Sequence, residues 1–188
     1  VTFALKNRTK SVNLGRIIDE AELRAQLDHV KQLRFEKNEL IWLAGNTFYG
    51  QERIFKPAYI EFLRRLHLPD YELSRNEDGD FILRFTGPWM HVTFWEIYAL
   101  SIVSELKSRA AMRSLSKFEL DVLYSCAKSK LWGNLQKIKE AGVLGLSDMG
   151  TRRRHSFLYQ EWAVLATAEA LGDGFAGTSN AYLAMKHG

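Results

Sequence analysis

Apolar and polar residues alternate in two separate parts of the chain. Val1, Phe3 and Leu5 share one face of an extended segment, which predicts a strand over residues 1–7. Residues 71–73 and 81–85 alternate on either side of Asn76-Glu77-Asp78-Gly79. This pattern predicts a β-hairpin in which Gly79 takes a positive φ, because glycine has no Cβ to oppose it.

Other apolar residues recur at helical spacing. The pair Asp19 and Glu22 predicts a capped start for a helix that carries Leu23, Leu27, Val30 and Leu33 on one face. Pro57 suits the first turn of a further helix that buries Ile60, Leu63 and Leu66. The sequence therefore predicts two amphipathic helices before the hairpin.

The second half of the chain is dominated by predicted helices. Residues 92–103 are apolar nearly all round, which is typical of a helix buried on several sides. Ser116 and Glu119 form a capping box at the start of the next helix. A last long helix is predicted from about Ser156 to Leu171, with Gly172 as its stop.

Two carboxylates lie in or near the apolar helix at residues 92–103. Glu96 and Glu105 need partners if they are buried, because an unpaired buried charge is costly. Arg109 follows Glu105 by four residues, which places it one helical turn away. We expect a structural ion pair between them.

A cluster of positive charge follows an apolar segment late in the chain. Val143, Leu144 and Leu146 predict a short buried strand, and Arg152, Arg153 and Arg154 lie between it and the last long helix. Ligands bind at this edge of α/β proteins, and arginine fits carboxylates and phosphates. Three cations at the start of a helix are unfavourable unless an anion binds there, because the helix N-terminus already carries positive potential. The cluster predicts anion capture, and the alternative is a solvated basic turn.

Composition narrows the class of protein. The chain has 188 residues, 46% hydrophobic residues and a net charge of +4, with a pI of about 9.2. This mild basicity suits anionic ligands and is no strong sign of nucleic acid. A single cysteine, Cys126, excludes an internal disulfide framework and favours the cytoplasm. The sequence shows no signal peptide, no membrane-spanning run and no metal-ligand spacing, so we expect neither a membrane nor a metal site.

Three motifs carry a resemblance to a known family. Asp148-Met149-Gly150-Thr151-Arg152-Arg153-Arg154 is similar to the Asp-Phe-Gly-Thr-Arg-Arg-Arg motif of the bacterial type of nicotinate phosphoribosyltransferases. Gly177-Thr178-Ser179-Asn180 resembles the Gly-Thr-Ser-Asn motif that follows it in that family. Upstream, residues 87–91 and 104–109 look like a third match, in the same order.

The resemblance implies an α/β fold of the type II phosphoribosyltransferase kind. An N-terminal α+β sandwich over residues 1–115 would precede the beginning of an irregular α/β barrel over residues 116–188. The family's chains are longer, with an earlier Asp-Phe-Tyr-Lys motif and later Gly-Thr-x-Ala-His and phosphate-loop motifs that are not found here. We therefore expect this chain to be an internal fragment that is inactive by itself.

The resemblance also implies a reaction. The family transfers a phosphoribosyl group from phosphoribosyl pyrophosphate to nicotinate, forming nicotinate mononucleotide in NAD salvage. The expected cofactors are Mg²⁺ and ATP, and the expected assembly is a homodimer with shared active sites. A basic RNA-binding or protein-interaction module without catalysis is the alternative, supported by the arginine cluster and five tryptophans.

The expected substrate-binding residues come from the two late motifs, and no catalytic residue can be named. Arg152 is the first candidate for holding a carboxylate or phosphate. The remaining candidates are Met149, Gly150, Thr151, Arg153, Thr178 and Ser179. Met149 stands where the family has a ring-stacking phenylalanine, and the alternative is a plain core methionine. Residues 178–180 can donate to phosphate oxygens, cap a helix near Ala181, or do both.

Two histidines near these motifs are expected to have ordinary roles. His155 follows the arginines and is interpreted as a polar residue of the first helical turn. His187 does not match the Gly-Thr-x-Ala-His motif and is interpreted as a surface histidine.

Overall fold

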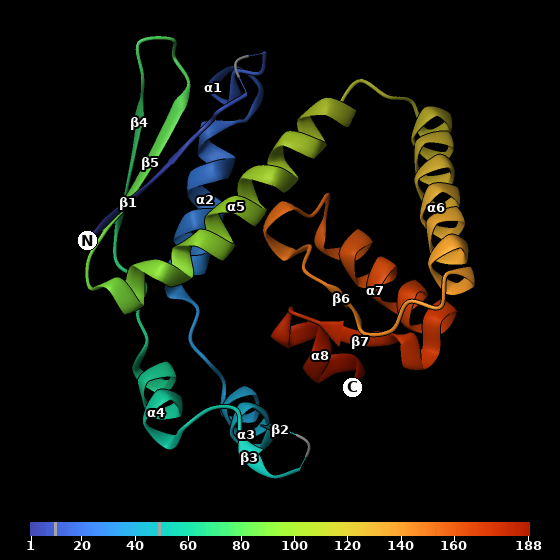
Figure 1. Cartoon of the computed structure of the whole chain (residues 1–188). Coiled ribbons are helices and arrows are strands. Elements are labelled where there is room, and N and C mark those ends of the chain that lie inside the picture. Colours follow the sequence, from blue (N-terminus) through green and yellow to red (C-terminus); the bar gives the residue numbers. More distant parts are fainter. Residues whose placement is uncertain (10, 49) are drawn as a thin grey trace. The chain divides into compact units, whose positions relative to one another are not determined.

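The chain consists of two compact units, Val1–Ala99 and Leu100–Gly188, which are described separately. The computed structural model describes residues 1–9, 11–48 and 50–188 (Figure 1). The mixed helices and strands confirm the predicted α/β class. The division lies within one long helix, α5 (Trp89–Met112). The predicted division into a sandwich over residues 1–115 and a barrel over 116–188 stays a prediction.

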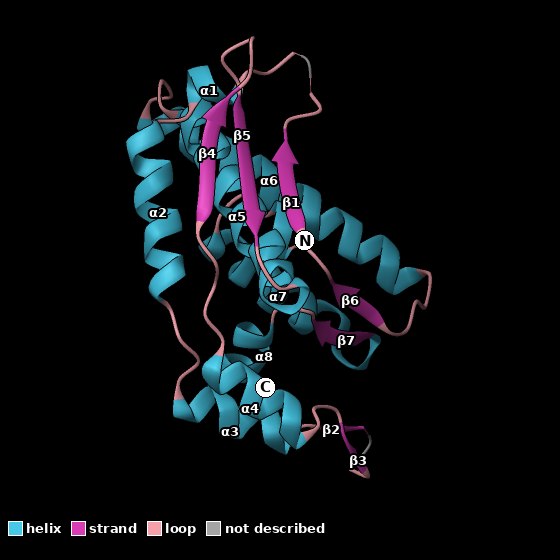
Figure 2. Cartoon of the chain, turned by 90° about the vertical axis from the view of Figure 1, so that its left-hand side faces the viewer, coloured by secondary structure: helices cyan, strands magenta, loops and turns pink. Residues whose placement is uncertain are grey.

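A three-stranded antiparallel sheet forms the centre of the first unit. Its order is β1 (Thr2–Lys6), β5 (Phe81–Thr86) and β4 (Tyr71–Arg75), so the N-terminal strand pairs with the hairpin (Figure 2). Gly79 has a φ of 77° in the hairpin turn, which confirms both the hairpin and its glycine.

One face of this sheet is buried by alternating apolar residues. Phe81, Leu83 and Phe85 are each at most 4% exposed. Trp95 of α5 is fully buried, stacks on Phe85 at a centroid distance of 4.8 Å and donates its indole N–H to the Pro69 carbonyl. A buried tryptophan with its N–H satisfied contributes a large apolar surface without leaving an unpaired donor. This face is therefore the main core of the first unit.

The helices described before the hairpin are α1 (Leu14–Ile17), α2 (Glu20–Gln32), α3 (Lys37–Gly45) and α4 (Pro57–Arg65). The predicted cap at Asp19 is confirmed, since its carboxylate accepts from the N–H groups of Ala21 and Glu22. Helices α3 and α4 share a second apolar cluster, made of Leu40, Leu43, Ile60, Leu63 and Leu66. Helices α1 and α3 and the short strands β2 (Thr47–Phe48) and β3 (Glu52–Arg53) were not predicted.

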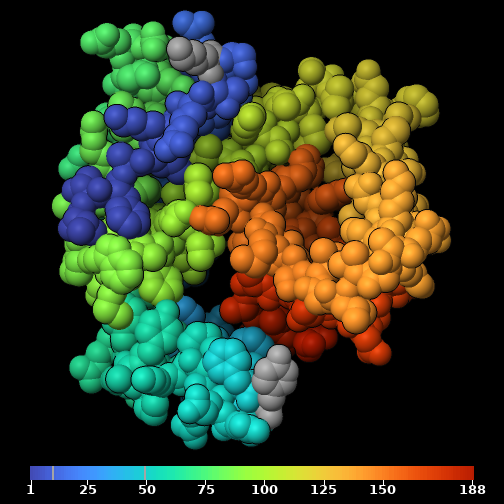
Figure 3. Space-filling view, in the orientation of Figure 1, coloured from blue at the N-terminus to red at the C-terminus, as the bar shows by residue number. Residues whose placement is uncertain are grey.

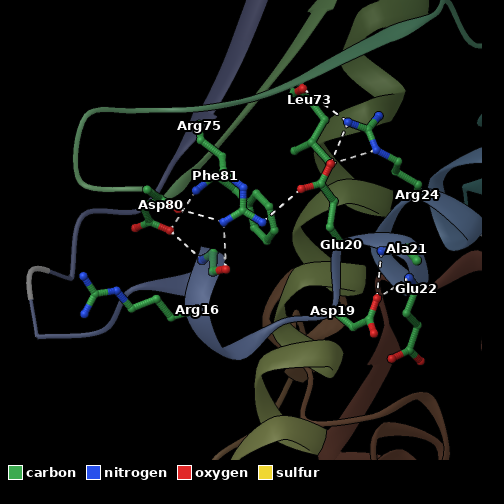
Figure 4. A network of polar contacts seen from close by, with 12 residues as sticks. Arg16, Asp19, Glu20, Ala21, Glu22, Arg24, Leu73, Arg75, Asp80 and Phe81 are labelled. Carbon is green, nitrogen blue, oxygen red and sulfur yellow. Dashed lines mark hydrogen bonds and ion pairs between the residues drawn. The ribbon is translucent and has the colours of Figure 1, made fainter.

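Ionic and polar contacts tie the helices to the hairpin (Figure 4). Glu20 accepts from Arg24 and Arg75, and both arginines lower the pKa of its carboxyl group. Arg75 also donates to the carbonyls of Gly15 and Gly79. Asp80 accepts from the N–H of Gly15 at 3.1 Å. The start of α2 and the turn of the hairpin are thus held by the same group of side chains.

The second unit contains α6 (Lys117–Glu140), β6 (Leu146–Asp148), α7 (Phe157–Leu171), β7 (Phe175–Thr178) and α8 (Ala181–His187). Two short 3-10 helices, η1 (Thr151–Arg153) and η2 (Gly172–Gly174), flank α7. Strands β6 and β7 are parallel and are joined through α7, which makes a βαβ unit (Figure 2). The capping box at Ser116 and the stop at Gly172 are confirmed.

Several large apolar residues of the second unit are exposed. Helix α6, yellow to orange in Figure 3, exposes Phe118 and Trp132, while Leu135 is its buried residue among those described. The predicted buried strand is also wrong in its first part. Val143 and Leu144 precede β6, and Leu144 is 80% exposed, because a tight turn with Gly142 and Gly145 at positive φ occupies this segment.

The apolar helix at residues 92–103 is part of α5, but it is not buried on every side. Trp89, Met90 and Ile97 are exposed, and Glu96 is exposed as well. The condition of burial is therefore not met at Glu96, because water reaches this side chain.

Candidate functional site

The carboxyl ends of β6 and β7 lie side by side. Asp148 at the end of β6 is in register with Thr178 at the end of β7. The loops that leave both strands are therefore neighbours, although 30 residues separate them in the chain. The carboxyl edge of a parallel pair is where α/β proteins bind ligands. We call residues 148–153 and 177–180 the strand-end site.

Asp148 joins the two loops of the strand-end site. Its Oδ1 accepts from the Gly150 N–H at 2.9 Å, and its Oδ2 accepts from the Thr178 hydroxyl at 2.8 Å. Its backbone carbonyl accepts from the Ser179 N–H at 2.8 Å. A carboxylate that accepts several hydrogen bonds is a strong anchor. Asp148 thus holds residues of both loops through its side chain and its backbone.

Gln160 of α7 completes this network. Its Nε2 donates to Asp148 Oδ2 at 2.9 Å and to the Thr151 hydroxyl at 3.0 Å. The side chain is buried, with 5% of its surface exposed. Sequence reasoning missed both Asp148 and Gln160 as site residues. Gln160 could have been identified from the sequence, because it is a polar residue in the mostly apolar sequence of α7.

The three arginines have different environments. Arg152 and Arg153 lie in η1 and are exposed, so solvent reaches both side chains at the strand-end site. Arg154 is largely buried, pairs with Glu105 at 2.5 Å and lies over the Phe157 ring. Arg154 is therefore a structural residue. Its pairing with Glu105 was not predicted, because the sequence pointed to Arg109 as the partner of that carboxylate.

The arginines also do not lie at the first turn of α7. That helix begins at Phe157, and its N-cap is Ser156, whose hydroxyl accepts from the Tyr159 N–H. The predicted effect of the helix dipole on Arg152 and Arg153 is therefore weaker, because such effects fall off within the first turn. The positive charge of the site comes mainly from the guanidinium groups themselves.

The remaining predicted residues surround the same edge. Met149 is 75% exposed, so the alternative of a core methionine was wrong. A Cβ at Gly150 would lie 2.9 Å from Asp148 Oδ1, so the absence of a side chain allows this close approach. Ser179 is exposed, whereas the Thr178 hydroxyl already donates to Asp148. Asn180 caps α8, as one of the alternatives predicted.

The two histidines have partners outside the strand-end site. His155 Nε2 is 2.9 Å from the Tyr124 hydroxyl, and its ring packs edge-on against Tyr124 and Tyr159. It belongs to an aromatic cluster rather than to a first helical turn. His187 contacts Glu161 at 2.8 Å and ties α8 to α7.

The strand-end site combines exposed guanidinium groups with a backbone held in place by a half-buried carboxylate. Such an arrangement suits the binding of carboxylates or phosphates, because arginine offers paired donors in a fixed plane. The histidine, cysteine, aspartate and glutamate side chains of the described residues form no group of three or more that could hold a metal ion. Each helix in the described part of the chain is too short or too polar to span a bilayer.

Arginines at the carboxyl end of a parallel strand pair are typical of anion-binding sites in α/β proteins. The comparison with known families is more specific, because residues 1–104 match the nicotinate phosphoribosyltransferase (NAPRTase) N-terminal domain. The chain therefore belongs to the nicotinate phosphoribosyltransferase family. The matched residues cover the first unit, and the strand-end site lies beyond them.

Solved structures support the fold of the whole chain. The chain is similar to nicotinate phosphoribosyltransferases from Vibrio cholerae (TM-score 0.76, 21% identity) and Porphyromonas gingivalis (TM-score 0.70, 22% identity). Each similarity covers 99% of this chain but only 42% and 44%, respectively, of those chains. The chain thus spans less than half the length of these proteins, and both units share their fold.

Proposed function

We propose that this chain takes part in transferring a phosphoribosyl group from phosphoribosyl pyrophosphate to nicotinate, giving nicotinate mononucleotide in NAD salvage. The observation that carries the proposal is the strand-end site, where Arg152 and Arg153 are exposed beside two loops joined by Asp148. Family membership supports this reaction over others that need an anion site.

In this reaction a bond forms between the ring nitrogen of nicotinate and the anomeric carbon of the sugar. The bond from that carbon to pyrophosphate breaks, and pyrophosphate leaves with the electron pair. No side chain needs to attack the sugar, so the protein's contribution is positioning and stabilisation of negative charge. Arg152 and Arg153 would bind the nicotinate carboxylate or the phosphates, and the exposed Met149 would contact the ring through its sulfur.

Mg²⁺ and ATP belong to the proposal through the family alone. The described residues offer no cluster of metal ligands, and the Asp148 carboxylate is already engaged by Gly150, Gln160 and Thr178. The residues in hand do not fit a direct magnesium site, so no step is derived through either group.

We also propose a cytoplasmic homodimer with shared active sites. Met149 of the strand-end site and Leu158 of α7 are 75% and 74% exposed, and these apolar side chains support an association of the second unit. Light scattering coupled to size exclusion tests the assembly, and a concentration-independent monomer would contradict it.

Calorimetric titration with pyrophosphate and with nicotinate tests the binding function. The Arg152→Ala variant should bind pyrophosphate about tenfold or more weakly, because a hydrogen bond to a charged group contributes roughly 1.5–3 kcal/mol. Arg152→Lys should recover part of the affinity, since an ammonium group cannot make the paired contacts of a guanidinium.

The matched control is Arg64→Ala on α4, which removes an arginine that is 64% exposed and lies in the first unit. Equal losses in Arg152→Ala and Arg64→Ala would show that only net charge matters. Tight, salt-sensitive binding of an RNA oligonucleotide instead of pyrophosphate would favour the RNA-binding alternative.

A further inference from the structure

The amide of Gln160 is oriented in only one way by its neighbours. Its Nε2 donates to the Asp148 carboxylate, which can only accept, and to the Thr151 hydroxyl. Its Oε1 is buried and has no hydrogen-bond partner among the residues that the structure describes. Turning the amide over would place that oxygen against the Asp148 carboxylate, so the bond to Asp148 would be lost and only the Thr151 hydroxyl could donate to the oxygen.

Packing alone does not explain a glutamine at this position. A buried acceptor without a donor costs free energy, whereas an apolar side chain of the same shape avoids that cost. Methionine has a similar length and would fill the same space in α7. We therefore attribute the presence of glutamine at this position to the two hydrogen bonds that its Nε2 donates.

The two partners of Gln160 Nε2, Asp148 and Thr151, connect the loops of the strand-end site. Asp148 binds the Gly150 N–H, the Thr178 hydroxyl and, through its carbonyl, the Ser179 N–H. Thr151 is the first residue of η1, the turn that carries Arg152 and Arg153. The Gln160 amide on α7 thus contacts both Asp148, which joins the two loops, and Thr151, which begins the turn with Arg152 and Arg153.

We propose that Gln160 is a positioning residue of the strand-end site. It fixes the turn that carries Arg152 and Arg153 relative to the loop at residues 177–180, so that these arginines and the exposed Ser179 hydroxyl reach one anion together. The identity of that anion rests on the proposed function, but the positioning itself can be measured without any ligand.

Two substitutions separate positioning from packing. Gln160→Met keeps the volume and removes both the donor and the unsatisfied oxygen. Gln160→Glu keeps the length but places a second carboxylate against Asp148 when it is ionised. The control is Thr167→Val, a buried residue two turns farther along the same face of α7, whose hydroxyl donates to the Ala163 carbonyl within the helix.

The first measurement is amide hydrogen exchange of the free protein by NMR. The N–H groups of Gly150 and Ser179 both bond to Asp148, so they report on the positioning directly. In Gln160→Met we expect them to exchange about tenfold or more faster, while the Val164 amide in the middle of α7 is unchanged. The melting temperature should change little, because removal of the unsatisfied oxygen offsets the loss of the hydrogen bonds to Asp148 and Thr151.

Unchanged exchange at Gly150 and Ser179 in Gln160→Met would overturn the proposal. The same would follow if Thr167→Val accelerated them equally, or if the Val164 amide lost as much protection, because the effect would then be a general loss of stability.

The second measurement is pyrophosphate titration of the same variants. We expect Gln160→Met to weaken binding about tenfold, Gln160→Glu to weaken it more, and Thr167→Val to leave it unchanged. If the unaltered chain binds no pyrophosphate, the proposed function fails, and the exchange data still decide the positioning. If it binds and Gln160→Met binds equally well, the positioning role is overturned.

Discussion

The two units of this chain bury their apolar residues to different degrees. The first unit covers its sheet with fully buried residues such as Trp95, Leu23 and Leu83. In the second unit Phe118, Leu144 and Leu158 are each at least 74% exposed, and β6 and β7 form a sheet of two strands among the described residues. The first unit has an extensive buried core, whereas the second exposes several large apolar side chains, and Met149 of the strand-end site is one of them.

This contrast indicates which kinds of contact stabilise each unit. The first unit is held by apolar packing, with ionic contacts added at its edge. The second unit has fewer buried apolar residues among those described, and polar contacts such as those of Asp148, Gln160 and the pair of Arg154 with Glu105 connect its elements. Substitutions of apolar residues should therefore be most damaging in the first unit, and substitutions of polar residues should be most informative in the second.

The largest effect is expected when a tryptophan is removed from the first unit. Trp95→Ala should lower the free energy of unfolding by about 3–5 kcal/mol, because the side chain is fully buried against Phe85. Trp132→Ala in α6 should cost about 1 kcal/mol or less, since that side chain is 54% exposed. Urea unfolding followed by circular dichroism measures both, and similar losses would abolish the contrast between the units.

A glycine in the first unit should be nearly as sensitive. A Cβ at Gly15 would lie 2.1 Å from the Gly79 carbonyl oxygen, so Gly15→Ala must displace the backbone of the hairpin turn. We expect a loss of about 3 kcal/mol from this overpacking. Gly45→Ala is the control, because nothing lies within 4 Å of its added Cβ and alanine favours the helix. A thermal melt of Gly15→Ala that matches that of Gly45→Ala would refute the close contact.

In the second unit, Gly150→Ala should act mainly on the site. Its Cβ would displace the Asp148 carboxylate, which is held by other hydrogen bonds, at a cost of about 1–2 kcal/mol. Gly133→Ala in α6 has open space and should be neutral or slightly stabilising. Pyrophosphate affinity and melting temperature should both fall in Gly150→Ala, and an unaltered affinity would separate Gly150 from the site.

The smallest expected effect is on the acid sensitivity of α8. Lys186, and after it His187, hydrogen-bond to Glu161 and lower the pKa of its carboxyl group below the ordinary value of 4.5. A lowered pKa in the folded state contributes stability above pH 4.5, and that contribution is lost as the pH falls through the folded value. The protection factors of the α8 amides, which are corrected for the intrinsic pH dependence of exchange, should therefore fall below pH 4.5, and Glu161→Gln should remove this dependence. A persistent dependence in Glu161→Gln would assign it to another carboxylate.

Several elements of both units could be predicted because their causes are local. The caps at Asp19 and Ser116 bond to N–H groups two or three residues away, and Gly79 turns a hairpin whose strands are close in sequence. Such contacts need only the neighbouring residues to form. The short elements α1, β2 and β3 were missed, because four residues or fewer carry too little periodicity.

The strand-end site was predicted in its residues but not in its arrangement. The motif around Arg152 pointed to an anion site, yet the separate roles of Arg152 and Arg154 could not be inferred from three identical neighbours. The exposure of Met149 was likewise undecided. The roles of the arginines and the exposure of Met149 depend on which residues from distant parts of the sequence pack against them.

The sequence by itself determined the α/β class, the caps, the hairpin and the family resemblance, because these depend on short-range spacing and on the order of motifs. Only the tertiary structure decided that Arg154 pairs with Glu105, that Asp148 joins the two loops, and that Gln160 reaches Asp148 from α7. These partners are 49, 30 and 12 residues apart in the chain. Contacts over such separations form only when packed helices and paired strands bring the residues together.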